Sequence, residues 1–313
     1  MRIGLIDVDG HNFPNIPLMK ISAWHKQRGD HVEWYKPLFS GHMDRVYLSK
    51  VFSFTPDYAE PIDADEVIKG GSGYCIETVD EKEIYKTEMD TPLPPEIEHI
   101  YPDYSLYPEQ TKGTAYGFLT RGCPRGCDFC HVAAKEGRCS VKVADLAEFW
   151  MGQEKIVLCD PNILACREWE DLLGQLVASG AVVDFNQGID VRMASPQKIA
   201  MLNKIRIKRL HLAWDRPEED LEPHFTRFNE LYCRKSPGVR VVYVLVNFNS
   251  TIEQDLHRIY TLRRLNFDPY IMIYDKEHAA PIYRKMARWV NCRMIWRKCP
   301  RFEDYDVSIT NRR

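Results

Sequence analysis

From residue 113 onward the sequence alternates between short apolar runs and helix-like stretches, and this alternation constrains the fold more than any other feature. The apolar runs, which we predict to be strands, cover residues 114–119, 155–159, 181–185, 208–213, 239–246 and 269–274. The stretches predicted to be helices cover residues 143–151, 168–179, 196–205, 218–235, 252–265 and 282–290. Strands rich in Val, Ile and Leu that alternate with helices are typical of a parallel sheet buried on both faces. The sequence therefore predicts an α/β fold, and six such units predict a partial (β/α)6 TIM-like barrel.

A smaller α/β region is predicted before the barrel, over residues 1–85. An apolar run at residues 3–7 predicts a strand, and Pro14 and Pro17 suit the opening of a helix that ends near Gly29. Further strands are predicted at residues 31–35, 45–49 and 67–68. Together these elements predict a small Rossmann-like open domain.

The remaining segments divide the chain further. Residues 86–112 contain five prolines and several tyrosines, and they predict an ordered linker that lies across a neighbouring domain. The barrel is predicted over residues 113–290, and residues 291–313 form a basic C-terminal extension.

Composition narrows the class of protein. The chain has 313 residues, 44% of them hydrophobic, and a net charge of −3, so no overall charge points to nucleic acid or membranes. It lacks a signal-peptide pattern and the roughly 18 consecutive apolar residues of a membrane span. We therefore expect a cytoplasmic protein with no membrane partner. Its ten cysteines are then expected to be reduced, which favours metal binding over disulfides.

The most informative segment runs from Thr120 to His131. It places Cys123, Cys127 and Cys130 in C-x3-C-x2-C spacing directly after the first predicted barrel strand. Three thiolates can bind three irons of a 4Fe-4S cluster and leave the fourth iron open to another ligand. The alternative is a structural zinc site, for which His131 or Cys139 could supply the fourth ligand. Zinc ribbons usually pair two C-x2-C knuckles, and the sequence has no second one.

The three cysteines and the aromatic Phe129 before Cys130 resemble the motif of the radical S-adenosylmethionine (SAM) superfamily. The resemblance covers about residues 113–290. It implies that the three cysteines bind a 4Fe-4S cluster, that SAM chelates the open iron, and that Phe129 lies near the adenine. It also implies an electron from a reductant such as flavodoxin or ferredoxin. That electron would cleave SAM into methionine and a 5′-deoxyadenosyl radical, which abstracts hydrogen from a substrate.

Polar residues follow the predicted barrel strands, where the active sites of such folds lie. They are Asp160, Asn162, Asn186, Gln187, Asp190, Arg192, Asp215, Asn247 and Asp275. Asp and Asn also favour turns and helix caps, so each residue alone has a structural explanation. The family often has a Gly-Gly-Glu-like segment after strand two, which Asp160 or Asn162 would replace here. The resemblance further predicts SAM contacts for Gln187, Arg192 and Asn247. Asp215, Tyr274 and Asp275 are left as catalytic candidates that face the substrate.

Residues 1–85 also resemble the cobalamin-binding domain of some radical SAM enzymes, in which D-x-H-x-x-G, a serine and a Gly-Gly pair follow in order. The matching residues are Asp9, Gly10, His11, Ser49, Gly70 and Gly71. Pro14 stands where the motif has glycine, and residues 36–44 are too few for a helix. These departures favour a degenerate domain. If cobalamin does bind, the leading function becomes a cobalamin-dependent radical SAM methyltransferase.

The basic segment at residues 284–301 supports a function of another class. It contains seven Lys and Arg residues, no acids, and Trp289 and Trp296. Basic residues interleaved with aromatics can bind RNA, and with zinc bound at the cysteines the chain would be a zinc-stabilised RNA-binding module. The same residues also fit the wet face of a helix whose apolar stripe includes Met286 and Trp289. The sequence leaves the substrate open among peptide, RNA and small molecule.

Overall fold

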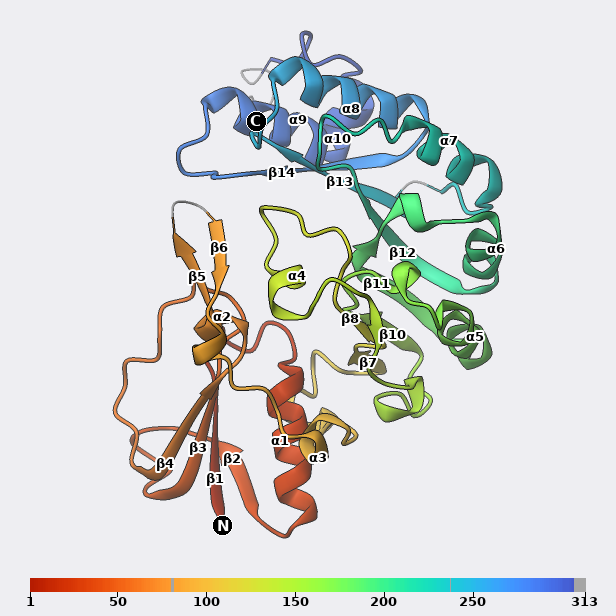
Figure 1. The fold of residues 1–313 in the computed structure, drawn as a ribbon. Coiled ribbons are helices and arrows are strands. Elements are labelled where there is room, and N and C mark those ends of the chain that lie inside the picture. The colour runs from red at the N-terminus through yellow and green to blue at the C-terminus, as the bar shows by residue number, and fades with distance from the viewer. Residues whose placement is uncertain (80–81, 237, 307–313) are drawn as a thin grey trace. The chain divides into compact units, whose positions relative to one another are not determined.

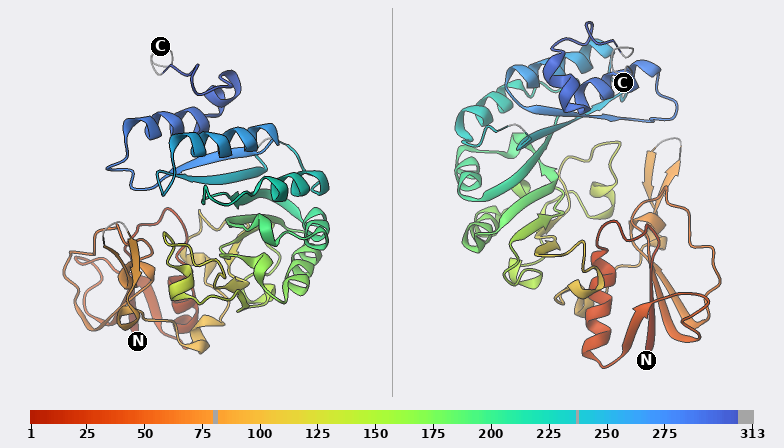
Figure 2. Two further views of the ribbon diagram at one scale, coloured as in Figure 1. Left: turned by 45° about the horizontal axis from the view of Figure 1, so that its top comes forward. Right: turned by 180° about the vertical axis from the view of Figure 1, so that it is seen from behind.

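The computed structural model describes residues 1–79, 82–236 and 238–306. The chain divides into two compact units, residues 1–168 and residues 169–313, which are described separately. Both contain parallel strands and helices (Figures 1 and 2). The predicted α/β class is therefore confirmed, while the six-unit partial barrel stays a prediction. Among the described residues, no helix combines the length and apolar character needed to cross a membrane.

Unit 1 begins with a four-stranded sheet in the order β2-β1-β3-β4. Its strands are β1 (Arg2–Asp7), β2 (His31–Trp34), β3 (Met43–Ser49) and β4 (Ala64–Gly70). Every pair in this sheet is parallel. Helix α1 (Ile16–Gln27) begins where the side chain of Asn15 accepts a hydrogen bond from the N–H of Leu18. Residues 35–42 contain no helix, as the short spacing predicts.

The core of this sheet contains apolar residues from β1 and α1. Ile3, Leu5, Leu18 and Ile21 pack together with Tyr47 of β3. Leu5 is 1% exposed and Leu18 is fully buried. The alternation of apolar side chains on β1 thus fixes α1 against one face of the sheet.

Several short elements connect this sheet to the cysteine motif. They are α2 (Ser72–Cys75), the antiparallel hairpin β5 (Ile76–Val79) and β6 (Lys82–Tyr85), and then η1 (Thr87–Met89), α3 (Pro95–Glu98) and η2 (Tyr104–Leu106). The predicted linker is held by its tyrosines. The Tyr107 side chain is 1% exposed, and the Tyr104 hydroxyl donates to the carbonyl of Phe149 at 2.6 Å.

The rest of unit 1 surrounds the motif. Strands β7 (Thr114–Gly117) and β10 (Lys155–Leu158) pair in parallel, and β8 (Thr120–Arg121) and β9 (Val141–Lys142) form a short antiparallel hairpin. The other elements are α4 (Val132–Lys135), η3 (Leu146–Glu148) and η4 (Ile163–Ala165). The predicted helix at residues 143–151 is wrong in extent, because only η3 forms there. A capping box between Asp145 and Glu148 closes this single turn.

Unit 2 contains four parallel strands in the order β14-β13-β12-β11. They are β11 (Val182–Ile189), β12 (Arg206–Ala213), β13 (Arg240–Val246) and β14 (Asp268–Ile273). The other elements are α5 (Trp169–Ser179), η5 (Val191–Met193), α6 (Pro196–Lys204), α7 (Glu222–Leu231), α8 (Ile252–Arg264), α9 (Pro281–Asn291) and α10 (Arg293–Lys298). Helices α5 to α8 lie along one side of these strands (Figure 1). Four of the predicted strands and their following helices thus appear in the predicted order.

Candidate cluster site around the cysteine motif

The three motif cysteines lie in one loop, between β8 and β9. Cys123 and Cys127 are half-buried, and Cys130 is exposed. The N–H of Cys123 donates to the carbonyl of Gly137 at 3.1 Å, and the N–H of Cys130 donates to the carbonyl of Cys127 at 3.0 Å. The loop therefore has internal backbone bonds at the first and last motif cysteine.

The pKa of the Cys130 thiol is affected by the other two motif cysteines. Crowding by surrounding protein atoms raises the pKa of the Cys130 thiol to about 11, and the Cys127 and Cys123 thiols add to this shift because neighbouring thiolates repel each other. The three sulfur atoms are thus near enough to affect one another. Among the described residues, no three Cys, His, Asp or Glu side chains are grouped as ligands of a single metal ion.

Gly122 is required by the way the loop folds back on itself. Its φ is +84°, and a β-carbon at this position would lie 2.2 Å from the carbonyl oxygen of Cys139. Gly137, on the opposite side of the loop, has a φ of +98° and open space around a β-carbon. A side chain at position 122 would therefore clash with backbone, whereas a side chain at position 137 would be disfavoured only by the positive φ.

We expect Gly122→Ala to disrupt the motif loop and Gly137→Ala to disturb it much less. The Gly137→Ala change costs the strain of a positive φ, about 1–3 kcal/mol, and Gly122→Ala adds a clash with backbone. Thermal melting and iron content after anaerobic reconstitution measure both effects. Equal iron content in the two variants would show that the close approach of Gly122 to Cys139 is not needed.

Asp160, directly after β10, holds the start of the motif. Its buried carboxylate accepts hydrogen bonds from the N–H of Leu119 at 3.1 Å and from the N–H and hydroxyl of Thr120 at 2.6 and 2.7 Å. Burial raises the pKa of Asp160 to about 6, although these hydrogen bonds oppose the shift. In the structure this side chain orients the backbone that leads into Cys123. Its predicted contact with SAM stays a prediction.

Asn162 is a predicted residue from outside the motif whose side chain reaches one of the motif thiols. It is 2% exposed, and its Nδ2 lies 3.7 Å from Cys123 Sγ. Its Oδ1 is buried and has no hydrogen-bond partner among the described residues. Buried acceptors are normally paired, so this atom is suited to a donor that belongs to a ligand. The motif thiols and Asn162 together fit a cluster with a bound amino group beside it.

Sequence reasoning missed Glu136 as a part of this site. Its carboxylate accepts a hydrogen bond from the N–H of Gly122 at 3.0 Å and pairs with the guanidinium of Arg121 at 2.8 Å. The residues around Glu136 form no recognisable motif, so the sequence does not distinguish it from a solvent-exposed acidic residue. Phe129 lies half-buried in the same loop.

The predicted residues of unit 2, other than Asp215, form two groups. Gln187 is exposed at a β-bulge in β11, where Gly188 has a φ of +95°. Arg192 pairs with Asp190 at 2.7 Å and also with Glu219. Two carboxylates thus already bind the guanidinium proposed for SAM.

The second group lies at the ends of β13 and β14. Asn247 and Asp275 both have positive φ, +67° and +43°, and Asn247 Nδ2 donates to the carbonyl of Tyr274 at 2.9 Å. Both oxygens of Asp275 lie within 3.0 Å of His278 Nδ1. Positive φ in non-glycine residues often marks functional sites. Sequence reasoning missed His278. Its position three residues after Asp275 could have indicated that the two side chains pair.

Asp215 follows β12. Burial raises its pKa to about 6, and one carboxylate oxygen accepts from the N–H of Leu245 at 3.2 Å. This carboxylate therefore keeps its proton at higher pH than a surface aspartate does.

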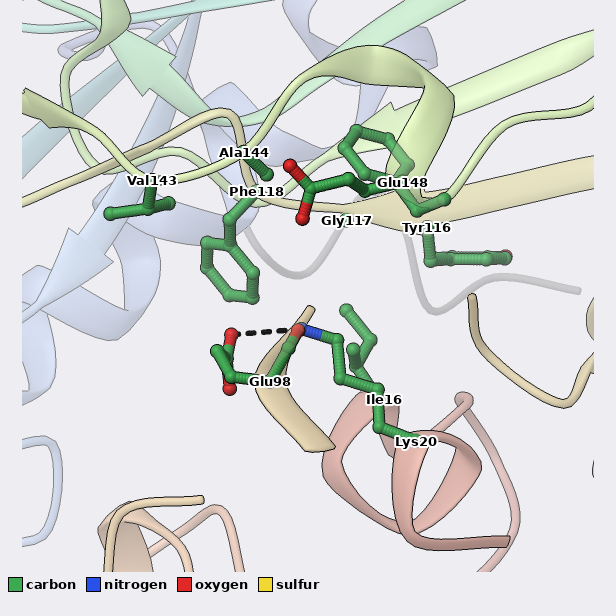
Figure 3. A pocket seen from close by; sticks show the side chains of 10 residues that line it. Ile16, Lys20, Glu98, Tyr116, Gly117, Phe118, Val143, Ala144 and Glu148 are labelled. Atoms are coloured by element: carbon green, nitrogen blue, oxygen red, sulfur yellow. Dashed lines mark hydrogen bonds and ion pairs between the residues drawn. The ribbon is translucent and has the colours of Figure 1, made fainter. Parts of the chain in front are cut away.

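A pocket in unit 1 contains none of the predicted site residues (Figure 3). It lies among α1, α3, β7 and the segment before β10. The Lys20 ammonium pairs with the Glu98 carboxylate at 2.8 Å on one side of it, and the Phe149 ring lies against Gly117, where a β-carbon would be 2.4 Å from the ring. We interpret it as a small gap in the packing between α1 and β7.

The residues that resemble a cobalamin site contact other residues of the N-terminal sheet and its loops. His11 follows β1, with its ring 4.4 Å from the Trp34 ring and its Nδ1 3.8 Å from Asp7. Asp9 accepts from the N–H of Val51 and from the hydroxyl of Thr55. These bonds fix the loop after β3.

Two further positions of that motif are closely packed. The Ser49 hydroxyl accepts from Asn15 Nδ2 at 2.9 Å, and a β-carbon on Gly71 would lie 2.4 Å from the carbonyl oxygen of Lys50. The packing around Ser49 and Gly71 is thus tight, and the degenerate domain stays a prediction.

Comparison with known proteins finds a similarity of fold. No protein-family model matches the chain, and no curated protein matches its sequence. Among solved structures it is similar to the radical S-adenosylmethionine methyltransferase TsrM from Kitasatospora setae, determined with cobalamin and a 4Fe-4S cluster bound. The TM-score is 0.58 at 12% sequence identity, and the match covers 87% of this chain and 74% of TsrM. This likeness shows the fold. A coverage of 87% exceeds what residues 113–313 could supply, so the similarity extends into the N-terminal sheet.

Proposed function

We propose that the chain is a radical SAM enzyme. Cys123, Cys127 and Cys130 would hold a 4Fe-4S cluster, and the cluster would supply the electron for cleavage of SAM to methionine and a 5′-deoxyadenosyl radical that abstracts hydrogen. The observation that carries this proposal is the contact of Asn162 with the motif loop. Its Nδ2 lies 3.7 Å from Cys123 Sγ, and its buried Oδ1 has no hydrogen-bond partner among the described residues. The shared fold with a radical SAM methyltransferase supports it.

The chain's own residues have distinct parts in this proposal. Asn162 Oδ1 would accept a hydrogen bond from the amino group of SAM, and its Nδ2, which donates to the Cys123 sulfur, would tune the cluster. Asp160 positions the backbone before Cys123. Phe129, Gln187, Arg192 and Asn247 stay predicted SAM contacts, and Asp215, Tyr274 and Asp275 stay predicted to face the substrate. A flavodoxin or ferredoxin would supply the electron.

A cobalamin-dependent methyltransferase is the second candidate. The observation that favours it is at the end of β1, where the exposed His11 lies beside the buried Asp7, whose Oδ1 has no partner among the described residues. Burial raises the pKa of Asp7 to about 6, and the Tyr107 hydroxyl donates to its other oxygen at 2.7 Å. The close packing at Ser49 and Gly71 opposes this candidate. A corrinoid absorption spectrum of protein purified without oxygen distinguishes the two.

The zinc-stabilised RNA-binding module has weaker support. Trp289 is fully buried and its Nε1 donates to the carbonyl of Cys299, so it packs inside unit 2. Arg284, Arg288, Arg293 and Arg297 lie exposed on α9 and α10. This arrangement favours the wet face of an amphipathic helix, and RNA contact through residues 284–301 stays a prediction.

Anaerobic reconstitution tests the proposed function. We expect a brown protein with about four irons per chain, which converts SAM to 5′-deoxyadenosine when dithionite is added. A colourless protein with one zinc and no SAM cleavage would contradict the proposal and support the binding module.

A further inference from the structure

Helix α4 directly follows Cys130, and both of its ends contact one N-terminal segment. At its start, His131 Nδ1 lies 2.5 Å from Glu83 Oε2 of β6. At its end, Lys135 Nζ lies 2.8 Å from both carboxylate oxygens of Asp90 and 3.1 Å from the Cys75 sulfur. Residues more than forty positions earlier in the chain therefore fix the helix that leaves the motif.

The contact at Lys135 is sheltered from water. The side chains of Lys135 and Asp90 are each 16% exposed, and Cys75 is fully buried. The Tyr85 hydroxyl donates to Asp90 Oδ2 at 2.9 Å, which satisfies the carboxylate further. A sheltered charge pair is costly to break on one side, because the remaining charge is left without a partner.

Other supports join the segment after α4 to the start of the motif: Glu136 bonds to Gly122 and Arg121, and the carbonyl of Gly137 accepts from the N–H of Cys123. The hairpin of the motif loop consists of only two residues in each strand, and Asp160 and Glu136 hold the end that leads into Cys123. The end after Cys130 depends on α4, which has four residues and is too short to be stable alone. The position of Cys130 is thus set by whatever holds α4.

We infer that Asp90, together with Tyr85 and Cys75, is a positioning group that holds Lys135 and so keeps Cys130 in place to bind the cluster. The inference rests on the proposed function. It assigns the segment of residues 75–90 to the support of the cluster site. Groups hydrogen-bonded directly to a metal ligand typically change metal affinity by about 10- to 100-fold. Asp90 acts through Lys135 and α4, so we expect an effect at the lower end of this range.

The test compares Asp90→Asn with wild type as full-length, reconstituted proteins. Excess bathophenanthroline is added without oxygen, and the loss of the cluster absorbance is followed with time. We expect Asp90→Asn to lose iron about tenfold faster. The matched control is Asp103→Asn, which removes another sheltered carboxylate of unit 1, paired with Lys26 at 2.6 Å and bonded to Ser22. It should lose iron at the wild-type rate.

Melting of the metal-free proteins shows whether a variant is folded. If Asp90→Asn does not fold, Tyr85→Phe carries the test, because it removes only the hydroxyl donor and should give a smaller but measurable acceleration over Asp103→Asn. Iron loss at the wild-type rate in the folded variant overturns the inference and leaves the proposed function standing. A wild-type protein that takes up no cluster would contradict both the inference and the proposed function. The two failures are therefore distinguishable.

Discussion

A Cys127→Ala chain is expected to bind no 4Fe-4S cluster and to produce no 5′-deoxyadenosine, while its metal-free form melts at the wild-type temperature. Three thiolates are needed to hold the cluster, and with two the remaining irons have no protein ligand. The fold should not change, since Cys127 is half-buried in a loop outside the apolar core. Iron and sulfide content, absorbance near the cluster bands and product analysis measure the effect.

Cys139→Ala is the matched control for this variant. Cys139 is an exposed thiol of the same loop, outside the three-cysteine motif. In the radical SAM interpretation it is not a ligand, and its removal should leave iron content and SAM cleavage unchanged. In the zinc interpretation it is a candidate fourth ligand, and its removal should weaken metal binding. Undiminished SAM cleavage by Cys127→Ala would show that the motif assignment is wrong.

The regular elements could be predicted because their periodicity is a local property. The strand predicted at residues 239–246 corresponds to β13, and the helix predicted at 252–265 corresponds to α8, whose start is marked by a capping box of Thr251 and Gln254. The strand predicted at 181–185 was too short. The strand continues to Ile189 through a β-bulge. Asn186 and Gln187 are polar and interrupt the apolar run, so the sequence pattern does not indicate this continuation.

The supports of the candidate site could not be predicted, because they join residues far apart in sequence. Asp160 was singled out as a residue after a strand, yet its bonds to Thr120 cross forty positions. The pairing of Lys135 with Asp90 crosses forty-five positions between two segments that share no pattern. Sequence patterns predict which atoms could bind a cluster, whereas the contacts of Asp160 and Lys135 follow only from the fold.

Arg258 is a second position where a distant network supports predicted site residues. Its side chain is 1% exposed and pairs with Asp255, which is fully buried. Its guanidinium donates to the carbonyls of Trp214 and Asp215 at 2.6 and 2.9 Å and to that of Leu245 at 2.9 Å. One arginine of α8 therefore joins the ends of β12 and β13, where Asp215 lies.

We expect Arg258→Met to destabilise unit 2 by about 3–5 kcal/mol, because it leaves the Asp255 carboxylate buried without its cation and three carbonyls without their donor. Urea unfolding followed by circular dichroism measures the loss. Methionine approximates the apolar part of the arginine side chain, so the loss of volume contributes little.

The matched control is Arg264→Met on the same helix. Arg264 is 59% exposed and pairs with Glu222 at 2.7 Å, and exposed pairs contribute about 0–1 kcal/mol. The difference between the two variants therefore isolates burial and the backbone bonds from charge alone. If Arg258→Met costs no more than Arg264→Met, the carbonyls at the ends of β12 and β13 do not depend on this guanidinium. Asp215 would then have to be held by β12 and β13 themselves.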